Sequence, residues 1–164
     1  MDIRHPIRVE HTFRQSLNGS PAEVLPLLCP VREADWVPGW APRLVLSDSG
    51  VAERDCVFIT PDPAAGPDAE AIWTIIHLDH GAGAVEMLKV TPGFLVVRLT
   101  IVLQPGANEA CFADVTYQYT ALGAAGEAYV ASRTSDAYRE FMKGWEAALN
   151  QYLAATRAHP GVAT

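Results

Sequence analysis

Four tryptophans are the residues of this chain best suited to bind a ligand, because large flat side chains often enclose apolar molecules. They are Trp36, Trp40, Trp73 and Trp145. Indole rings hold a flat compound by stacking and by apolar burial rather than by charge. Ordinary core packing uses the same rings, and that role fits Trp73 and Trp145 at least as well. The tryptophans therefore predict a pocket for a flat or apolar molecule, with core packing as the alternative for two of them.

Tyrosines and a methionine form a second group with the same possible use. Tyr117, Tyr119 and Tyr138 carry hydroxyl groups among apolar neighbours, and a buried tyrosine hydroxyl usually has a hydrogen-bond partner. That partner is either a backbone carbonyl or an oxygen atom of a ligand. Met142 supplies adaptable volume, which suits a pocket and a core alike. Tyr117, Tyr138 and Met142 join the four tryptophans in the predicted ligand-binding set.

Catalytic and metal-binding patterns are sparse. The segment His77-Leu78-Asp79-His80 contains metal-ligating types, but side chains three apart on a strand point to opposite faces, and no third ligand stands at useful spacing. Glu33 and Asp35 could act as acid or base, or they could be surface charges at a helix start. Neither a glycine-rich phosphate loop nor a nucleophile elbow is visible. We therefore expect no metal and no cofactor, and no catalytic residue is identified.

Length and charge limit the classes of protein to which this chain can belong. The chain has 164 residues, which fits one domain over 1–164 with its core at about 8–155. A net charge of −7 disfavours nucleic acid as a partner. No apolar run is long enough for a membrane span, and the N-terminus lacks the apolar core of a signal peptide. Three cysteines without Cys-x-x-Cys spacing fit free thiols. We expect a cytoplasmic protein, and no pattern here defines its oligomeric state.

The elements that would position these side chains can be placed from periodicity and turn residues. Ser20-Pro21-Ala22-Glu23 is a capping box that starts a short helix, and Arg32 to Trp40 favours one more helical turn. Apolar residues at helical spacing predict a long terminal helix covering at least 137–153. Turn residues separate the strands, and the short connections predict antiparallel neighbours. The expected strands lie near 8–18, 42–48, 55–60, 70–78, 84–91, 94–104 and 109–120.

Strand registers predict which side chains face inward. A turn centred on Gly106 would place Leu99, Ile101, Ala113 and Val115 on one buried face and Arg98 opposite Asp114 on the other.

The turn at Pro92-Gly93 leaves two registers open. A three-residue loop would turn Val85 and Met87 inward, whereas a two-residue loop would turn Glu86 inward. The three-residue loop is favoured because an ordinary Pro-Gly turn splays a two-residue hairpin. Trp73, Ile75 and His77 would then also point inward.

This order of elements, with particular residues, resembles the START-like superfamily of helix-grip proteins, which includes polyketide cyclases and pollen-allergen-like binders. The residues that carry the resemblance are Ser20-Pro21-Ala22-Glu23, the segment from Glu33 to Trp40, Ile72-Trp73 and Trp145. The resemblance implies an α+β fold in which a curved sheet of about seven antiparallel strands surrounds a long C-terminal helix. It also implies that Trp36 and Trp40 border the mouth of a cavity, where they would contact a ligand.

Three functions remain open because such a fold does not define an activity. The leading expectation is binding or transport of a small hydrophobic molecule, lipid-like or aromatic, in the internal cavity. A cyclase or dehydratase that uses polar groups in the same cavity is the alternative. A partner-binding module is the third. An acid or base inside the cavity would favour an enzyme, and an exposed apolar patch would favour partner binding.

Overall fold

Seven antiparallel strands form one curved sheet in the computed structural model, which describes residue 1 and residues 3–158. The order across the sheet is β1-β7-β6-β5-β4-β3-β2, so the first and last strands in the sequence lie side by side. Apolar residues alternate with polar ones along most strands, which makes one face a core face. The strands are β1 (Arg8–Leu17), β2 (Leu44–Leu46), β3 (Val57–Pro61), β4 (Glu70–Asp79), β5 (Ala84–Thr91), β6 (Leu95–Pro105) and β7 (Cys111–Ala121).

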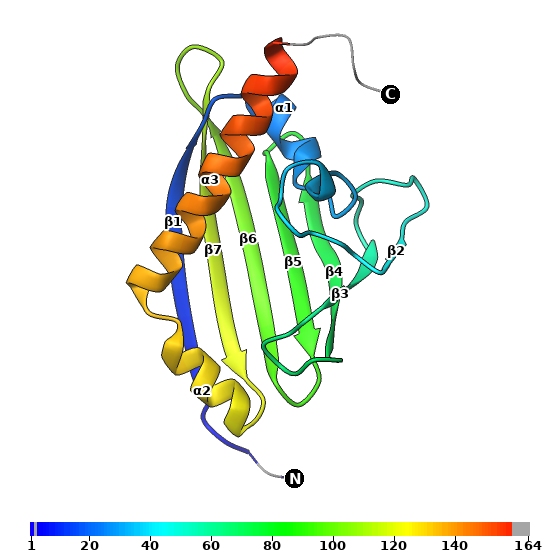
Figure 1. Cartoon of the computed structure of the whole chain (residues 1–164), viewed down its shortest axis with the longest axis vertical. Coiled ribbons are helices and arrows are strands. Elements are labelled where there is room, and N and C mark those ends of the chain that lie inside the picture. The colour runs from blue at the N-terminus through cyan, green and yellow to red at the C-terminus, as the bar shows by residue number, and fades with distance from the viewer. Residues whose placement is uncertain (2, 159–164) are drawn as a thin grey trace.

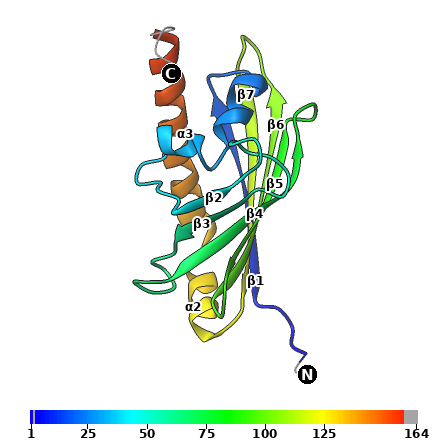
Figure 2. The same cartoon turned by 90° about the vertical axis from the view of Figure 1, so that its right-hand side faces the viewer.

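Within the part of the chain that the structure describes, five helical segments accompany the sheet. The long helix α3 crosses its concave face, and the short N-terminal helices close one end of the molecule (Figures 1 and 2). The expected α+β helix-grip fold is therefore confirmed. The helical segments are α1 (Pro21–Val24), the 3₁₀ turns η1 (Leu25–Leu27) and η2 (Arg32–Asp35), α2 (Ala124–Ser132) and α3 (Ser135–Ala158).

The predicted capping box starts α1. The Ser20 hydroxyl accepts from the Glu23 N–H at 3.4 Å, and the Glu23 carboxylate accepts from the Ser20 N–H at 2.8 Å. These two bonds satisfy backbone donors that the helix itself leaves unpaired. Glu23 also pairs with Arg157 at 3.1 Å, which joins the end of α3 to the start of α1.

Helix α3 is attached to one edge of the sheet. It packs most extensively against β1. The Gln15 amide donates to the Met142 carbonyl at 3.0 Å, and the Ser16 N–H donates to the Glu146 carboxylate at 2.7 Å. Further along, the Asn18 N–H donates to the side chain of Asn150 at 2.8 Å. Because α3 is held at the β1 edge, the rest of the inner face lies farther from it, and the cavity that forms there is lined by residues of β3 to β7.

The β5–β6 turn has the predicted three-residue loop. Thr91 pairs with Leu95 across it, and Val85 and Met87 are buried as expected. Trp73 and Ile75 also point inward.

The prediction for His77 is wrong because β4 carries an irregularity between Ile75 and His77. The extra residue reverses the alternation, so His77 is exposed and pairs with Glu86 instead of facing the core.

The β6–β7 hairpin has the predicted faces but not the predicted register. Leu99, Ile101, Ala113 and Val115 are buried. However, Leu99 pairs with Tyr117, so the turn is centred on Asn108 rather than on Gly106. The pairing register is shifted by an even number of residues, so the same side chains still face the core.

The expected contact between Arg98 and Asp114 is therefore wrong. Asp114 pairs with Arg14 at 2.6 Å and Arg98 pairs with Glu86 at 2.9 Å. Asn108 and Glu109 both have positive φ, which lets the chain make this wider turn.

Candidate functional site

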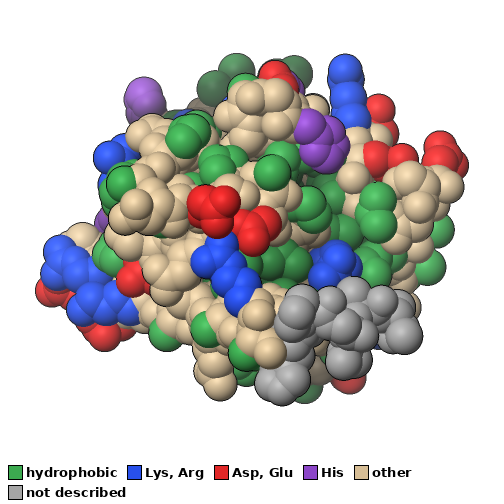
Figure 3. All heavy atoms as spheres, turned by 90° about the horizontal axis from the view of Figure 1, so that it is seen from above, with side chains coloured by type: hydrophobic (Ala, Val, Ile, Leu, Met, Phe, Trp, Pro, Cys, Tyr) green, Lys and Arg blue, Asp and Glu red, His purple; other side chains and the backbone are tan. Residues whose placement is uncertain are grey.

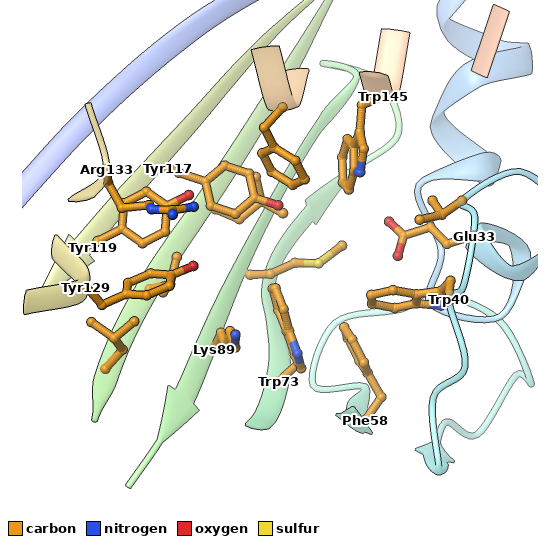
Figure 4. Close-up of a pocket in the computed structure, with 16 residues that line it drawn as sticks. Glu33, Trp40, Phe58, Trp73, Lys89, Tyr117, Tyr119, Tyr129, Arg133 and Trp145 are labelled. Atoms are coloured by element: carbon orange, nitrogen blue, oxygen red, sulfur yellow. The ribbon is translucent and has the colours of Figure 1, made fainter. Parts of the chain in front are cut away.

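A cavity of about 290 Å³ lies between α3 and the inner face of the sheet. The strands contribute most of its apolar wall, and the segment after η2 and helix α3 complete it. Phe141 lines the cavity and is also 46% exposed, so the cavity reaches solvent beside α3. Figure 4 shows these side chains converging on one space. The apolar side chains from the strands are Phe58, Trp73, Met87, Leu95, Val97 and Leu99.

Trp40, Trp73 and Trp145 line the cavity, and Tyr117 does so too. The Trp40 indole N–H donates to the Pro30 carbonyl at 2.7 Å. The Trp73 indole N–H donates to the Thr60 hydroxyl at 3.0 Å. With their polar atoms already bonded, the Trp40 and Trp73 rings offer apolar faces to the cavity. Whether these four residues contact a ligand stays a prediction.

Trp36, Tyr138 and Met142 were predicted to bind ligand but lie behind the cavity wall. The Trp36 indole donates to the Leu27 carbonyl at 2.9 Å, and its ring packs edge-on against Trp145 at 5.4 Å. The Tyr138 hydroxyl donates to the Val115 carbonyl at 2.7 Å. Met142 is fully buried. In this arrangement Trp36 packs against Trp145 and Tyr138 packs against Tyr117, so these two side chains support residues that line the cavity.

Glu33 places a carboxyl group at one end of the cavity. It comes from η2 and is 4% exposed. No group in the described part of the chain hydrogen-bonds its side chain, and burial raises its pKa to about 8. At neutral pH most molecules therefore carry a protonated Glu33, which can donate or accept a hydrogen bond and can exchange a proton near pH 8.

Lys89 is a cation in the wall with a partner of its own. Its ammonium group lies 2.9 Å from the Asp62 carboxylate and 5.6 Å from the centre of the Trp73 ring. Asp62 is buried and also accepts from the Thr91 hydroxyl at 2.6 Å. The positive charge of Lys89 is thus compensated by the protein.

The end of the cavity opposite Glu33 gathers two tyrosine hydroxyls, of Tyr119 and Tyr129, and the guanidinium group of Arg133. Tyr117 lines the cavity between this end and Glu33, and its hydroxyl points towards the middle. Burial raises the pKa of all three tyrosines, so their hydroxyls stay protonated and can donate hydrogen bonds. Figure 4 shows Tyr119, Tyr129 and Arg133 grouped on one side and Glu33 on the other.

Sequence reasoning did not single out Lys89, Tyr129 or Arg133 as site residues. Lys89 lies two residues after Met87, so strand alternation could have found it. Tyr129 belongs to α2, a helix that the sequence analysis did not predict, and Arg133 lies just beyond the end of that helix. No motif marks either residue, because their position depends on how α2 packs against the sheet.

Neither a metal-binding cluster nor a membrane-spanning helix is found among the described residues. Among them, no three His, Cys, Asp or Glu side chains gather as a metal site would require. No helix within them is long and apolar enough to cross a membrane. Figure 3 shows acidic and basic side chains interspersed on the end of the molecule that it views.

Comparison with known proteins identifies the fold. No family model matches the chain, and no curated protein matches it. Norcoclaurine synthase from Thalictrum flavum matches over 93% of this chain and 98% of its own, with 13% identity and a TM-score of 0.68. One structure of that enzyme is a complex with dopamine and hydroxybenzaldehyde.

Two other solved structures show the same arrangement. Ara h 8.0201 matches over 90% of this chain and 99% of its own, with 14% identity and a TM-score of 0.58. A protein from Rhizobium loti matches over 91% and 99%, with 13% identity and a TM-score of 0.62. At such low identity, these structural similarities are evidence for the fold alone. The chain thus has the same helix-grip fold as these solved structures.

Proposed function

We propose that this protein binds a small molecule with an aromatic or otherwise apolar body in the cavity beneath α3. The observation that carries the proposal is a cavity of about 290 Å³ whose wall is formed mainly by apolar and aromatic side chains. Ligand sites typically combine such a wall with a small number of polar groups. The neighbouring fold of norcoclaurine synthase, seen with two single-ring aromatic compounds, supports the same use of the space.

Apolar burial would supply most of the affinity. Each Å² of apolar surface removed from water contributes roughly 25 cal/mol before the costs of association. Trp40, Trp73 and Trp145 offer flat surfaces from three sides, which favours rings over flexible chains. Selectivity among molecules of similar shape would then depend on the few polar groups at the two ends of the cavity.

Tryptophan fluorescence during titration tests the proposal, because three of the four tryptophans line the cavity. The panel comprises fatty acids, sterols and aromatic polyketides, and saturable quenching by at least one class is expected. Val97→Phe places a ring inside the cavity and should weaken that binding, whereas Val96→Phe on the outer face of the same strand should not. If no compound changes the fluorescence, or if Val97→Phe binds as tightly as the natural protein, the proposal fails.

Proton transfer by Glu33 is the second candidate, as part of a cyclase-type or dehydratase-type reaction. The specific observation is a buried carboxyl group in the cavity wall with a pKa of about 8 and no hydrogen-bond partner among the described residues. Its carboxylate form could take a proton from a carbon next to a ligand carbonyl, and the hydroxyl of Tyr117, which points towards the middle of the cavity, could stabilise the resulting enolate oxygen.

Deuterium exchange tests this second candidate without knowledge of the natural substrate. An aryl methyl ketone is incubated with the protein in D₂O, and deuterium in its methyl group is followed by mass spectrometry. Faster exchange than in buffer is expected, with a rate that rises towards pD values where Glu33 is ionised. Glu33→Gln should abolish the enhancement while it retains ketone binding by fluorescence. An enhancement that survives in Glu33→Gln excludes Glu33 as the base.

A further inference from the structure

Arg133 holds a buried donor that the protein leaves without a partner. Its Nε atom is buried and has no hydrogen-bond partner among the described residues. Its Nη2 atom reaches only the hydroxyl of the adjacent Ser132, at a long 3.4 Å. Because an unsatisfied buried N–H loses its bonds to water and gains nothing in return, such groups are rare and usually reflect a missing partner.

The position of Arg133 is held by its surroundings rather than by a counter-ion. Its N–H donates to the Val130 carbonyl at 3.0 Å, and its own carbonyl lies 2.6 Å from Nε2 of His11. Its guanidinium group lies 4.5 Å from the centre of the Tyr129 ring. No Asp or Glu in the described residues forms an ion pair with it. The side chain is therefore placed against the cavity with its charge uncompensated.

The other charges of the cavity do not compensate for Arg133. Asp62 is already paired with Lys89 at 2.9 Å. Glu33 lies at the opposite end, and its raised pKa keeps it mostly neutral at pH 7 (Figure 4). The hydroxyls of Tyr119 and Tyr129 lie on the same side as Arg133 and have no hydrogen-bond partner among the described residues. This end of the cavity thus offers several donors and a net positive charge, which together favour an anion.

We propose that the ligand is an aromatic or apolar carboxylic acid whose carboxylate binds to Arg133, with the Tyr119 and Tyr129 hydroxyls as further donors. This assignment rests on the proposed function, since it concerns the same cavity. A planar guanidinium group matches the two oxygens of a carboxylate. The apolar body of the ligand would extend along Trp73 towards Trp40, and the far end would meet the neutral carboxyl of Glu33.

A matched pair of probes separates charge recognition from apolar burial. 2-Naphthoate and 2-naphthamide have the same rings and nearly the same shape, but only the first is an anion. We expect the natural protein to bind 2-naphthoate about tenfold or more tightly than 2-naphthamide, as hydrogen bonds to a charged group commonly allow. Dissociation constants come from tryptophan fluorescence and are repeated by calorimetry at constant ionic strength.

Arginine variants assign that preference to one residue. Arg133→Met should reduce the preference for 2-naphthoate to less than about twofold while 2-naphthamide binding changes little. Arg133→Lys keeps the charge without the planar fork and should retain part of the preference. Arg139→Met removes an exposed arginine of α3 that pairs with Asp136 and should leave the preference unchanged. Circular dichroism checks that each variant is folded.

The outcomes distinguish this assignment from the proposed function. Equal affinity for the two probes in the natural protein overturns the assignment to carboxylic acids but leaves apolar binding intact. A full preference in both Arg133→Met and Arg133→Lys overturns the role of Arg133. If neither probe binds to the natural protein, and no compound of the wider panel binds either, both the assignment and the proposed function are wrong.

Discussion

Glu33 illustrates how burial changes what a common side chain can do. A carboxyl group in water is ionised above pH 5, but Glu33 is 4% exposed and desolvation raises its pKa to about 8. The folded protein therefore retains a proton on Glu33 over a pH range in which the unfolded chain has lost it. Proton binding and folding are linked, so this single residue should make stability depend on pH.

The stability of the protein should fall between pH 5 and pH 9 because of Glu33. In that window the folded state binds one more proton than the unfolded state, so the free energy of unfolding decreases as pH rises. The loss levels off above the folded pKa of about 8 and is on the order of 4 kcal/mol. Glu33→Gln should remove most of it in urea unfolding at pH 5.5 and pH 8.5. Glu140→Gln, an exposed control with a lowered pKa, should keep the slope of the natural protein, and a slope that persists in Glu33→Gln contradicts the assignment.

The ion pair between Asp62 and Lys89 should matter more than exposed pairs elsewhere on the sheet. Asp62→Asn leaves the Lys89 ammonium group without its counter-ion in a site that is only 17% exposed. We expect a loss of roughly 2–3 kcal/mol in the free energy of unfolding, because one charge of a largely buried pair stays behind. Glu86→Gln, which breaks the more exposed pair with Arg98, should cost less than about 1 kcal/mol. Equal losses in the two variants would show that the burial of the Asp62 pair contributes nothing.

Individual site residues were predictable where they belong to a regular pattern. The inward direction of Tyr117 and Tyr119 follows from strand alternation, and the same alternation marks Lys89. Arg133 follows no pattern, since it lies between two helices and its role depends on packing. Trp36 is the opposite case. Its residue type suits a ligand site, but its indole N–H donates a hydrogen bond to the Leu27 carbonyl. Residue type alone cannot distinguish lining the cavity from supporting its wall.

Among the elements, strands and turns were predicted better than their registers. Turn residues separate the strands clearly, and the three-residue loop after Thr91 follows from the geometry of a Pro-Gly turn. The wider turn around Asn108 depends on two non-glycine residues with positive φ, which sequence patterns rarely reveal. The irregularity in β4 before His77 has no glycine to mark it. Helix α2 was not predicted because its residues lack an amphipathic pattern.

Helix α2 should be the element most sensitive to a single methyl group. A Cβ atom at Gly126 would lie 2.0 Å from the Phe94 carbonyl oxygen, which also accepts from the Leu122 N–H. The Phe94 backbone cannot move aside as a flexible side chain can, so Gly126→Ala must displace α2. We expect a loss of roughly 1–3 kcal/mol or more in urea unfolding, and weaker ligand binding because α2 carries Tyr129.

Gly144 in α3 provides the matched control. A Cβ atom there meets nothing within 4 Å. Gly144→Ala should therefore stabilise the protein by roughly 0.5–1 kcal/mol, because alanine loses less backbone entropy in a helix interior. If both variants change the free energy of unfolding by the same amount and in the same direction, the close approach of α2 to Phe94 does not affect stability.

The protein as a whole combines a closed core with a cavity. Leu149 and Leu153 are buried near one end of α3, whereas Trp145 and Phe141 in its middle line the cavity. The attachment of α3 to β1 explains the difference, since the helix is close to one edge of the sheet and far from the other. A cavity could be expected from the order of elements, but its wall could not, because the wall depends on the tilt of α3 and on α2.

Ligand binding should stabilise the entire fold if the cavity is the site. A ligand that binds only the folded state at a free concentration of about one hundred times its dissociation constant contributes about 2.7 kcal/mol. In a chain of this size that gain raises the Tm by roughly 5–10 °C. Thermal unfolding with 2-naphthoate should show this shift in the natural protein and in Val96→Phe. Val97→Phe fills part of the cavity and should show little shift, because the ring occupies space that the ligand needs. An equal shift in Val97→Phe would place the ligand elsewhere on the protein.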